Sequence, residues 1–220
     1  MERFLFDGPE GAARTLVLAH GAGAPMDSAF MNRVAAGVGA ADASEGGFRV
    51  ARFEFPYMRA RRESGRRGAP DRPAVLLESW REAIRELSGP RGPATLVIGG
   101  KSMGGRIASM VADEAEVGGL VCLGYPFHPP GQPTKLRVAH LEALQTPALF
   151  LQGTRDSFGT EDEISRYSLS KKIRVLFLPD GDHSFKPRAS SGRTEAQNVA
   201  EAIALVVAFL EEISRPEGRG

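Results

Sequence analysis

The sequence predicts an α/β fold, with a mostly parallel sheet of about six or seven strands and helices on both faces. Short apolar runs, each ended by glycine, proline or aspartate, alternate with segments whose apolar residues recur at helical spacing. Alternating strands and helices form βαβ units, and such units build parallel sheets. Most of the apolar runs are nearly continuous in Val, Leu, Ile and Phe, which is typical of strands covered on both faces.

The expected strands follow one another at regular intervals along the chain. The run FRVARFEF alternates polar and apolar residues, so we expect it nearer to an edge, and RFLFDG would add a further edge strand. In order, the expected strands are 3–8, 15–20, 48–55, 94–99, 119–126, 147–153 and 173–181.

The expected helices lie between these strands and after the last one. Asp27 or Ser28 is a plausible N-cap of the first, and TEDE opens the fourth with a cap followed by acidic residues. The last helix is long and amphipathic. In order, the expected helices are 27–38, 73–87, 102–112, 160–169 and 194–213.

Length and composition indicate one domain over residues 1–214, and we expect the tail 215–220 to be disordered. A net charge of +1 favours neither nucleic acid nor an anionic membrane as a partner. Cys122 is the one cysteine, which suits a reducing compartment. The start of the chain lacks the apolar stretch of a secretory signal, and no apolar run could cross a bilayer. We therefore expect a cytoplasmic protein, whose oligomeric state the sequence leaves open.

The stretch GGKSMGG at 99–105 lies between an expected strand and an expected helix. It contains G-x-S-x-G, with Ser102 at its centre, in the strand-to-helix context that this motif requires. A corner this sharp strains the serine backbone and exposes its hydroxyl. We expect Gly100 and Gly104 to crowd each other across the corner, and Gly105 to let the helix lie close to the sheet. Ser102 is therefore the candidate nucleophile; the alternative is a structural turn.

A serine nucleophile needs a base, and the base needs an acid to orient it. His183 follows the last expected strand in a glycine-containing loop, and Asp156 follows the strand before it. The order Ser102, Asp156, His183 places all three on loops at one edge of the sheet. Asp180 and Asp182 are rival acids, but close neighbours in a tight loop seldom reach the far nitrogen of the imidazole.

The tetrahedral intermediate of acyl transfer needs two hydrogen-bond donors. We expect one to be the backbone N–H of Met103, the residue after the nucleophile. The other is expected in the loop His20-Gly21-Ala22-Gly23, whose small residues let a backbone N–H approach a substrate. We favour Ala22, with Gly21 and Gly23 beside it, and we expect His20 to be structural.

Over nearly its whole length the chain resembles the α/β-hydrolase superfamily. It is most similar to the group that contains the hydrolase-like domain of a non-specific-lethal complex subunit and testis-expressed relatives, with dienelactone-hydrolase-like bacterial members. This resemblance implies the α/β-hydrolase fold and the same three catalytic residues. Where dienelactone hydrolase has a cysteine nucleophile, this chain has Ser102. The stretches that carry the resemblance are LAHGAGAPMDSAFM (18–31), FEFPYM (53–58), GGKSMGGR (99–106), LGYPFHPPG (123–131), QGTRDSFG (152–159) and GDHSF (181–185).

Two inserted stretches, 56–73 and 125–141, follow expected strands and should lie near the site. Both are short, so we expect no large lid. From the second we expect Tyr125 and Phe127 to line the cleft. His128 could contact substrate there, but we favour a packed structural role for it. Lys101 is expected to line the pocket or to pair with an acid.

The first inserted stretch is rich in arginine and leaves two interpretations open. It could be a solvated, flexible loop, or its guanidinium groups could bind a carboxylate or phosphate of an anionic substrate. We place Arg61 and Arg62 among the candidate substrate-binding residues. The remaining arginines of this stretch considered for that role are Arg59, Arg66 and Arg67.

These observations predict a serine hydrolase that cleaves an ester or thioester of a small molecule without a metal or an organic cofactor. The alternative is a non-catalytic or weakly catalytic protein-interaction module on a hydrolase scaffold, since the resemblance includes a complex subunit. An intact triad argues against that alternative, because a scaffold has no need of all three residues.

Overall fold

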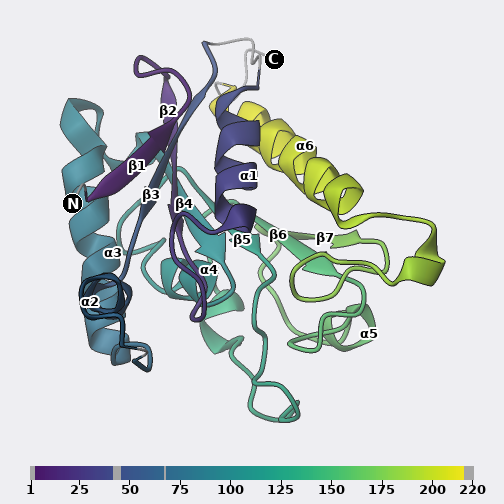
Figure 1. Ribbon diagram of the computed structural model, residues 1–220. Helices are drawn as coiled ribbons and strands as arrows, with labels where there is room; N and C mark the ends of the chain where they lie inside the picture. Colours follow the sequence, from purple (N-terminus) through teal and green to yellow (C-terminus); the bar gives the residue numbers. More distant parts are fainter. Residues whose placement is uncertain (1–2, 42–45, 67, 216–220) are drawn as a thin grey trace.

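Seven strands form one sheet in the computed structural model, which describes residues 3–41, 46–66 and 68–215 (Figure 1). Their order across the sheet is β1-β3-β2-β4-β5-β6-β7, with β1 antiparallel to β3 and the other pairs parallel. This confirms the predicted α/β fold. The strands are β1 (Phe4–Asp7), β2 (Arg14–Ala19), β3 (Phe48–Phe53), β4 (Leu96–Lys101), β5 (Gly119–Leu123), β6 (Ala148–Gly153) and β7 (Ile173–Leu178).

Helices cover both faces of the sheet. In Figure 1, α1 and α6 lie together on one face, and α3 and α4 lie on the other. Short 3-10 turns at Gly89–Arg91, Pro93–Thr95, Ala139–Leu141 and Ala189–Ser191 complete the regular structure of the described residues. The α-helices are α1 (Ala29–Gly39), α2 (Pro56–Ser64), α3 (Pro73–Ser88), α4 (Met103–Ser109), α5 (Glu161–Ile164) and α6 (Glu195–Ser214).

Two apolar cores lie on opposite faces of the sheet, because successive side chains of a strand point to opposite sides. In β2, Val17 packs into the core under α3 and α4, whereas Leu16 and Leu18 pack into the core under α1 and α6. The first core also buries the ring of Trp80 completely, and its indole N–H donates to the carbonyl of Gly104. Burial on both faces explains why the sequence runs of the central strands are continuously apolar.

The strand order reverses direction beside β2. The chain passes from β2 to β3 on one side and then returns to β4 on the other side of β2. In open α/β sheets the loops at the carboxyl ends of the strands separate at such a switch point and leave a crevice there. The two loops that border this crevice begin at His20 and at Ser102, so the topology brings the two glycine-rich stretches together.

Two segments differ most from the prediction. The arginine-rich stretch begins as α2 because Pro56 occupies its first turn, where the missing N–H costs nothing, and Gly65 ends it in the left-handed region. Helix α5 is a single turn, shorter than the predicted 160–169. Thr160 and Glu163 form its capping box, after which the hydrogen bonds tighten and the chain turns Tyr167 back onto the core.

Some predictions fall outside the described residues: Arg67 and positions 216–220 of the tail. Across the part of the chain that the structure describes, no helix combines the length and the hydropathy needed to span a membrane.

Candidate active site

Ser102 occupies the corner between β4 and α4 with a strained backbone. Its φ of 51° and ψ of −115° lie in a region that residues with a side chain rarely adopt. The conformation is held in place because the N–H of Ser102 donates to the carbonyl of Leu123 at 3.0 Å, and its own carbonyl accepts from the N–H of Arg106 at 3.0 Å. The corner therefore fixes where the hydroxyl lies.

Glycines flank this serine because the backbone of β2 lies against the corner. A Cβ at Gly100 or Gly104 would lie 2.1 or 2.3 Å from the carbonyl oxygen of Ala19. The nearest obstacle for both glycines is therefore the end of β2, which the sequence alone does not indicate. A Cβ at Gly105 would lie 2.7 Å from the carbonyl oxygen of Gly100, in agreement with its predicted role in close helix packing.

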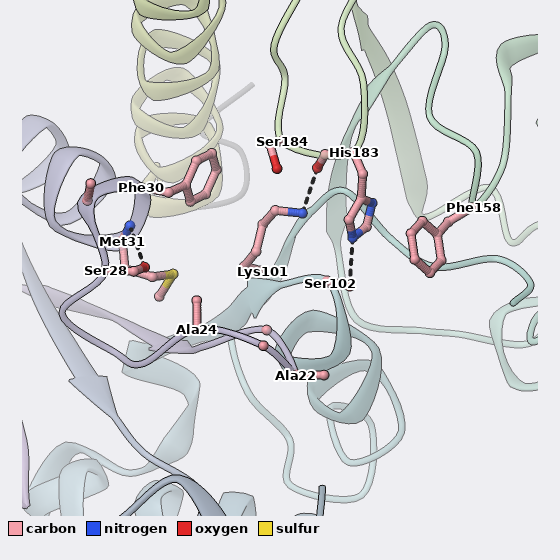
Figure 2. A pocket seen from close by; sticks show the side chains of 13 residues that line it. Ala22, Ala24, Ser28, Phe30, Met31, Lys101, Ser102, Phe158, His183 and Ser184 are labelled. Atoms are coloured by element: carbon pink, nitrogen blue, oxygen red, sulfur yellow. Dashed lines mark hydrogen bonds between the residues drawn. The ribbon is translucent and has the colours of Figure 1, made fainter. Parts of the chain in front are cut away.

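His183 points its imidazole at Ser102 (Figure 2), and Asp156 lies at the other nitrogen of the ring. Its Nε2 is 2.8 Å from Oγ of Ser102, and its Nδ1 is 2.8 Å from Oδ2 of Asp156. Because a carboxylate accepts, Nδ1 carries the proton, and Nε2 is then free to accept the hydroxyl proton of the serine. The structure thus brings together three side chains from the ends of β4, β6 and β7.

Asp156 is fully buried and surrounded by donors. Its carboxylate accepts from Nε2 of Gln152 at 2.9 Å and from the backbone N–H of Phe158 at 2.9 Å, besides the imidazole of His183. All three partners donate, which is the pattern expected around a charged carboxylate. The predicted rivals make other contacts: Asp180 pairs with Arg188, and Asp182 accepts backbone N–H groups of its own loop.

The imidazole of His183 is set up to be neutral near neutral pH. Burial lowers the pKa of His183 below its ordinary value, and the charge of Lys101 lowers it further, whereas the hydrogen bond to Asp156 acts in the opposite direction. The ring of Phe158 lies against the imidazole, with ring centroids 4.1 Å apart. The two rings are tilted by 30°, so Phe158 packs against one face of the proposed base.

The loop after β2 is held by hydrogen bonds from the segment that follows β3. His20 is buried; its Nε2 accepts from the N–H of Phe55 at 3.2 Å, so its Nδ1 carries the proton and donates to the carbonyl of Gly21 at 2.7 Å. Tyr57 donates from its hydroxyl to the carbonyl of Ala22 at 2.9 Å. These bonds fix the two peptide planes around Ala22, and they support the predicted structural role of His20.

The arginines of α2 hold the same loop and lie outside the cavity. Arg61 reaches the carbonyl of Gly23 at 3.4 Å, and Nε of Arg62 donates to the buried carboxylate of Glu54 at 2.8 Å. Arg62 also pairs with Asp27. The predicted contact of Arg61 and Arg62 with substrate stays a prediction, because neither residue lines the cavity and their contacts are with Gly23, Asp27 and Glu54.

A cavity of about 520 Å³ opens beside Ser102 (Figure 2). Its walls are mostly apolar and come from the loop after β2, the start of α1, and the loops that carry Asp156 and His183. The predicted positions Gly21, Ala22, Gly23 and Lys101 lie on it. The lining residues are Gly21, Ala22, Gly23, Ala24, Ser28, Ala29, Phe30, Met31, Lys101, Ser102, Phe158, His183 and Ser184.

Three residues considered for the cleft lining are buried instead. Tyr125 and Phe127 have no exposed surface; Tyr125 stacks on Phe150 with ring centroids 5.0 Å apart, and its hydroxyl donates to the carbonyl of Arg137. His128 is 3% exposed and lies outside the cavity lining. The prediction for Tyr125 and Phe127 is wrong, because both rings pack into the core against Phe150, whereas the burial of His128 agrees with a packed role.

Lys101 is the last residue of β4, and its side chain contributes to the cavity wall. Nζ donates to the carbonyl of His183 at 2.6 Å. Burial lowers the pKa of Lys101 to about 8, while the carboxylates of Asp156 and Asp182 act in the opposite direction. Of the two predicted roles, the structure supports lining the pocket, because no carboxylate of the described residues lies within ion-pair distance of Lys101.

Comparison with known proteins identifies the family. The model of the "Alpha/beta hydrolase domain" family matches residues 12–211. The chain belongs to the α/β-hydrolase family. Its fold is similar to dienelactone hydrolase from Anabaena variabilis, with a TM-score of 0.69 at 20% identity over 95% of this chain and 90% of that one.

Two further solved structures share the α/β-hydrolase fold. A serine hydrolase without a lid from Xanthomonas campestris has a TM-score of 0.68 at 16% identity over 95% of this chain and 88% of that one. Est1E from Butyrivibrio proteoclasticus has a TM-score of 0.67 at 12% identity over 96% of this chain and 94% of that one. Like the lidless structure, this α/β-hydrolase has no separate domain over its sheet among the residues described.

Sequence reasoning missed four residues of this α/β-hydrolase site. Tyr57 and Glu54 hold the loop after β2, Gln152 donates to Asp156, and Phe158 stacks on His183. A charged residue within the apolar run FRVARFEF was a usable signal for Glu54, because a buried carboxylate needs donors. Phe158 lies two residues after Asp156, yet only the folded loop shows which way its ring points.

Proposed function

We propose that the protein is a serine hydrolase that cleaves esters or thioesters of small molecules through an acyl-enzyme. The proposal rests on one observation: the imidazole of His183 is hydrogen-bonded on one side to Ser102 and on the other to Asp156, each at 2.8 Å. This is the relation between nucleophile, base and orienting acid that acyl transfer by a serine requires.

In the first half of the proposed reaction, Oγ of Ser102 attacks the carbonyl carbon while Nε2 of His183 takes the hydroxyl proton. The carbonyl π-electron pair moves to the oxygen, which becomes an oxyanion. Asp156 stabilises the imidazolium through its bond to Nδ1 without taking the proton itself. When the oxyanion collapses, the bond to the alcohol or thiol breaks, and His183 gives its proton to that leaving group.

The proposed oxyanion donors are the backbone N–H groups of Met103 and Ala22, with Gly21 adjacent to the second. Met103 begins α4, so its N–H has no partner within the helix. The N–H of Ala22 belongs to the same planar peptide as the carbonyl of Gly21, which His20 holds. In a trans peptide these two groups point in opposite directions, so the bond from His20 also sets where this N–H points.

In the second half, a water molecule attacks the acyl carbon while His183 takes one of its protons. The second tetrahedral oxyanion uses the same donors and collapses to release the acid, and His183 returns the proton to Oγ of Ser102. Water has direct access because the cavity is open and none of the described residues forms a lid over it. A cavity of about 520 Å³ with mostly apolar walls favours short to medium acyl chains.

The proposal is tested by an ester and thioester panel of varied chain length, assayed on the wild-type protein and on Ser102→Ala. We expect hydrolysis of short-chain esters or thioesters that falls about 10⁴-fold in the variant. The variant removes one oxygen atom, so unchanged thermal melting would show that the fold is intact. Hydrolysis that persists in Ser102→Ala would contradict the proposal.

A further inference from the structure

The cavity beside Ser102 carries a single cationic side chain. Of the described residues that line it, Lys101 is the one lysine or arginine; the remaining walls are glycines and alanines, aromatic rings, Met31 and three serines. An ammonium group on an apolar wall is costly unless it has a partner, because it loses much of its hydration. A negatively charged group on the substrate would supply that partner.

The backbone around Lys101 leaves room for its head group. A Cβ at Gly124 would lie 2.9 Å from Nζ, so a side chain at that position would push the ammonium aside. The φ of Gly124 is +68°, which also disfavours other residues. The ring of Phe30, on the cavity wall, has its centroid 5.8 Å from Nζ. The head group thus occupies a defined place between the loop of His183 and the start of α1 (Figure 2).

The ammonium group keeps unused hydrogen-bonding capacity. It has three N–H donors, and the structure gives it one hydrogen bond, to the carbonyl of His183, among the described residues. The carboxylates of Asp156 and Asp182 are close enough to raise the pKa of Lys101, but neither residue lines the cavity. Asp156 is buried behind the imidazole, and Asp182 accepts backbone N–H groups of its own loop.

We propose that Lys101 makes the enzyme selective for esters or thioesters that carry a carboxylate group, which its ammonium binds within the cavity. This inference rests on the proposed function, and it is independent of the predicted anion contacts of Arg61 and Arg62. The ammonium contributes two donors and a charge to the carboxylate, in surroundings where few other groups compete. Such charge-assisted bonds increase binding by about tenfold to a hundredfold.

The test compares substrates that differ only at one end. The monoethyl esters of succinic, glutaric and adipic acids are matched with ethyl butyrate, pentanoate and hexanoate, in which a methyl group replaces the carboxylate. Acetate esters of ω-hydroxy acids and of the matching alcohols place the charge on the alcohol side instead. Release of acid is followed by pH-stat for the wild-type protein, Lys101→Met, Lys101→Arg and the control Lys135→Met, whose lysine is exposed and outside the cavity.

We expect the wild-type protein to have a kcat/KM at least tenfold higher for one carboxylate-bearing series than for its neutral match. Lys101→Met should lose this preference, measured as the ratio of kcat/KM between each carboxylate-bearing ester and its neutral match. Lys101→Arg should retain part of it, and Lys135→Met should behave as wild type. Equal loss on both series in Lys101→Met would mean that the lysine only supports the loop of His183, and would overturn the inference.

The wild-type comparison stands even if Lys101→Met fails to fold. A wild-type protein that hydrolyses neutral esters as well as their carboxylate matches would overturn the selectivity and leave the proposed hydrolase function intact. Failure of the proposed function itself would look different, because hydrolysis of every substrate would then be absent or independent of Ser102.

Discussion

His20 donates from Nδ1 to the carbonyl oxygen of Gly21 at 2.7 Å, and this bond orients the peptide whose N–H belongs to Ala22. The tautomer is fixed from the other side of the ring, because Nε2 accepts from the N–H of Phe55. Burial lowers the pKa of His20, so the neutral ring that both bonds require is favoured. A histidine outside the proposed triad is thereby connected to the proposed oxyanion site.

Replacing His20 should affect the chemical step more than substrate binding. We expect His20→Ala to lower kcat about tenfold to a hundredfold with little change in KM, somewhat less than the removal of an oxyanion donor. His20→Asn, whose amide can reach the carbonyl of Gly21, should recover part of the loss. Steady-state kinetics on both variants tests this, and equal changes in kcat for the two would argue against orientation of this peptide.

Tyr57 offers a milder test of the same loop. Tyr57→Phe removes the hydroxyl that donates to Ala22 and keeps the ring, so we expect kcat to fall several-fold while the free energy of unfolding drops by about 1–3 kcal/mol. Kinetics and chemical denaturation measure the two effects separately. The loop would not depend on this bond if kcat were unchanged.

The close packing of α4 against the end of β2 can be tested by replacing a glycine with alanine. In Gly104→Ala the new methyl group would lie 2.3 Å from the carbonyl oxygen of Ala19, a backbone atom that cannot easily move. We expect the free energy of unfolding to fall by about 3 kcal/mol or more, and Tm by roughly 6 to 12 °C. Gly11→Ala is the matched control, since a methyl group there would have no atom beyond its chain neighbours within 4 Å. Equal Tm values for the two variants would contradict close packing of α4 against the end of β2.

The pH dependence of activity should reflect the lowered pKa of His183. The base must be neutral, so activity is lost as pH falls through this pKa, and the acid limb of kcat/KM should have its midpoint below 6.5. The charge of Lys101 helps to lower this pKa, so Lys101→Met should move the limb to higher pH. A pH–rate profile with a neutral ester measures the midpoint in the wild-type protein and its shift in Lys101→Met. An acid limb that moves to lower pH in the variant would contradict the assignment of this limb to His183.

Selectivity for carboxylate-bearing esters should depend on the protonation of Lys101, and therefore on pH. The pKa of Lys101 is lowered to about 8, so the ammonium loses its charge as pH rises through that value. The ratio of kcat/KM for a carboxylate-bearing ester to kcat/KM for its neutral match should therefore fall above pH 8 in the wild-type protein. In Lys101→Arg the ratio should stay constant to higher pH, because the guanidinium group keeps its charge. A ratio that does not change between pH 7 and pH 9 would argue against charge recognition by Lys101.

The fold was predictable because its signals are local. Each strand is a short apolar run closed by a turn residue, and each βαβ unit must bury the same two faces, so the order of elements implies a parallel sheet. The three proposed catalytic residues were predictable for the same reason. Parallel strands end at one edge, and Ser102, Asp156 and His183 each follow such an end.

The partners of side chains were less predictable. The arginines of α2 indicated a charged surface, but the sequence does not show that Arg62 would meet Glu54, a buried carboxylate at the end of β3. Similarly, nothing local shows that Tyr125 and Phe127 turn inward onto the ring of Phe150. In both segments, long-range packing decides which side chains face the cavity.

The central claim is that the hydroxyl of Ser102 is an activated nucleophile, and covalent labelling tests it most directly. The wild-type protein is treated with fluorophosphonate probes of several sizes and analysed by intact mass and peptide mapping. We predict one adduct, located on Ser102, absent in Ser102→Ala and formed much more slowly in His183→Ala and Asp156→Asn. Labelling that persists in Ser102→Ala, or no labelling of the folded wild-type protein by any probe, would contradict the account.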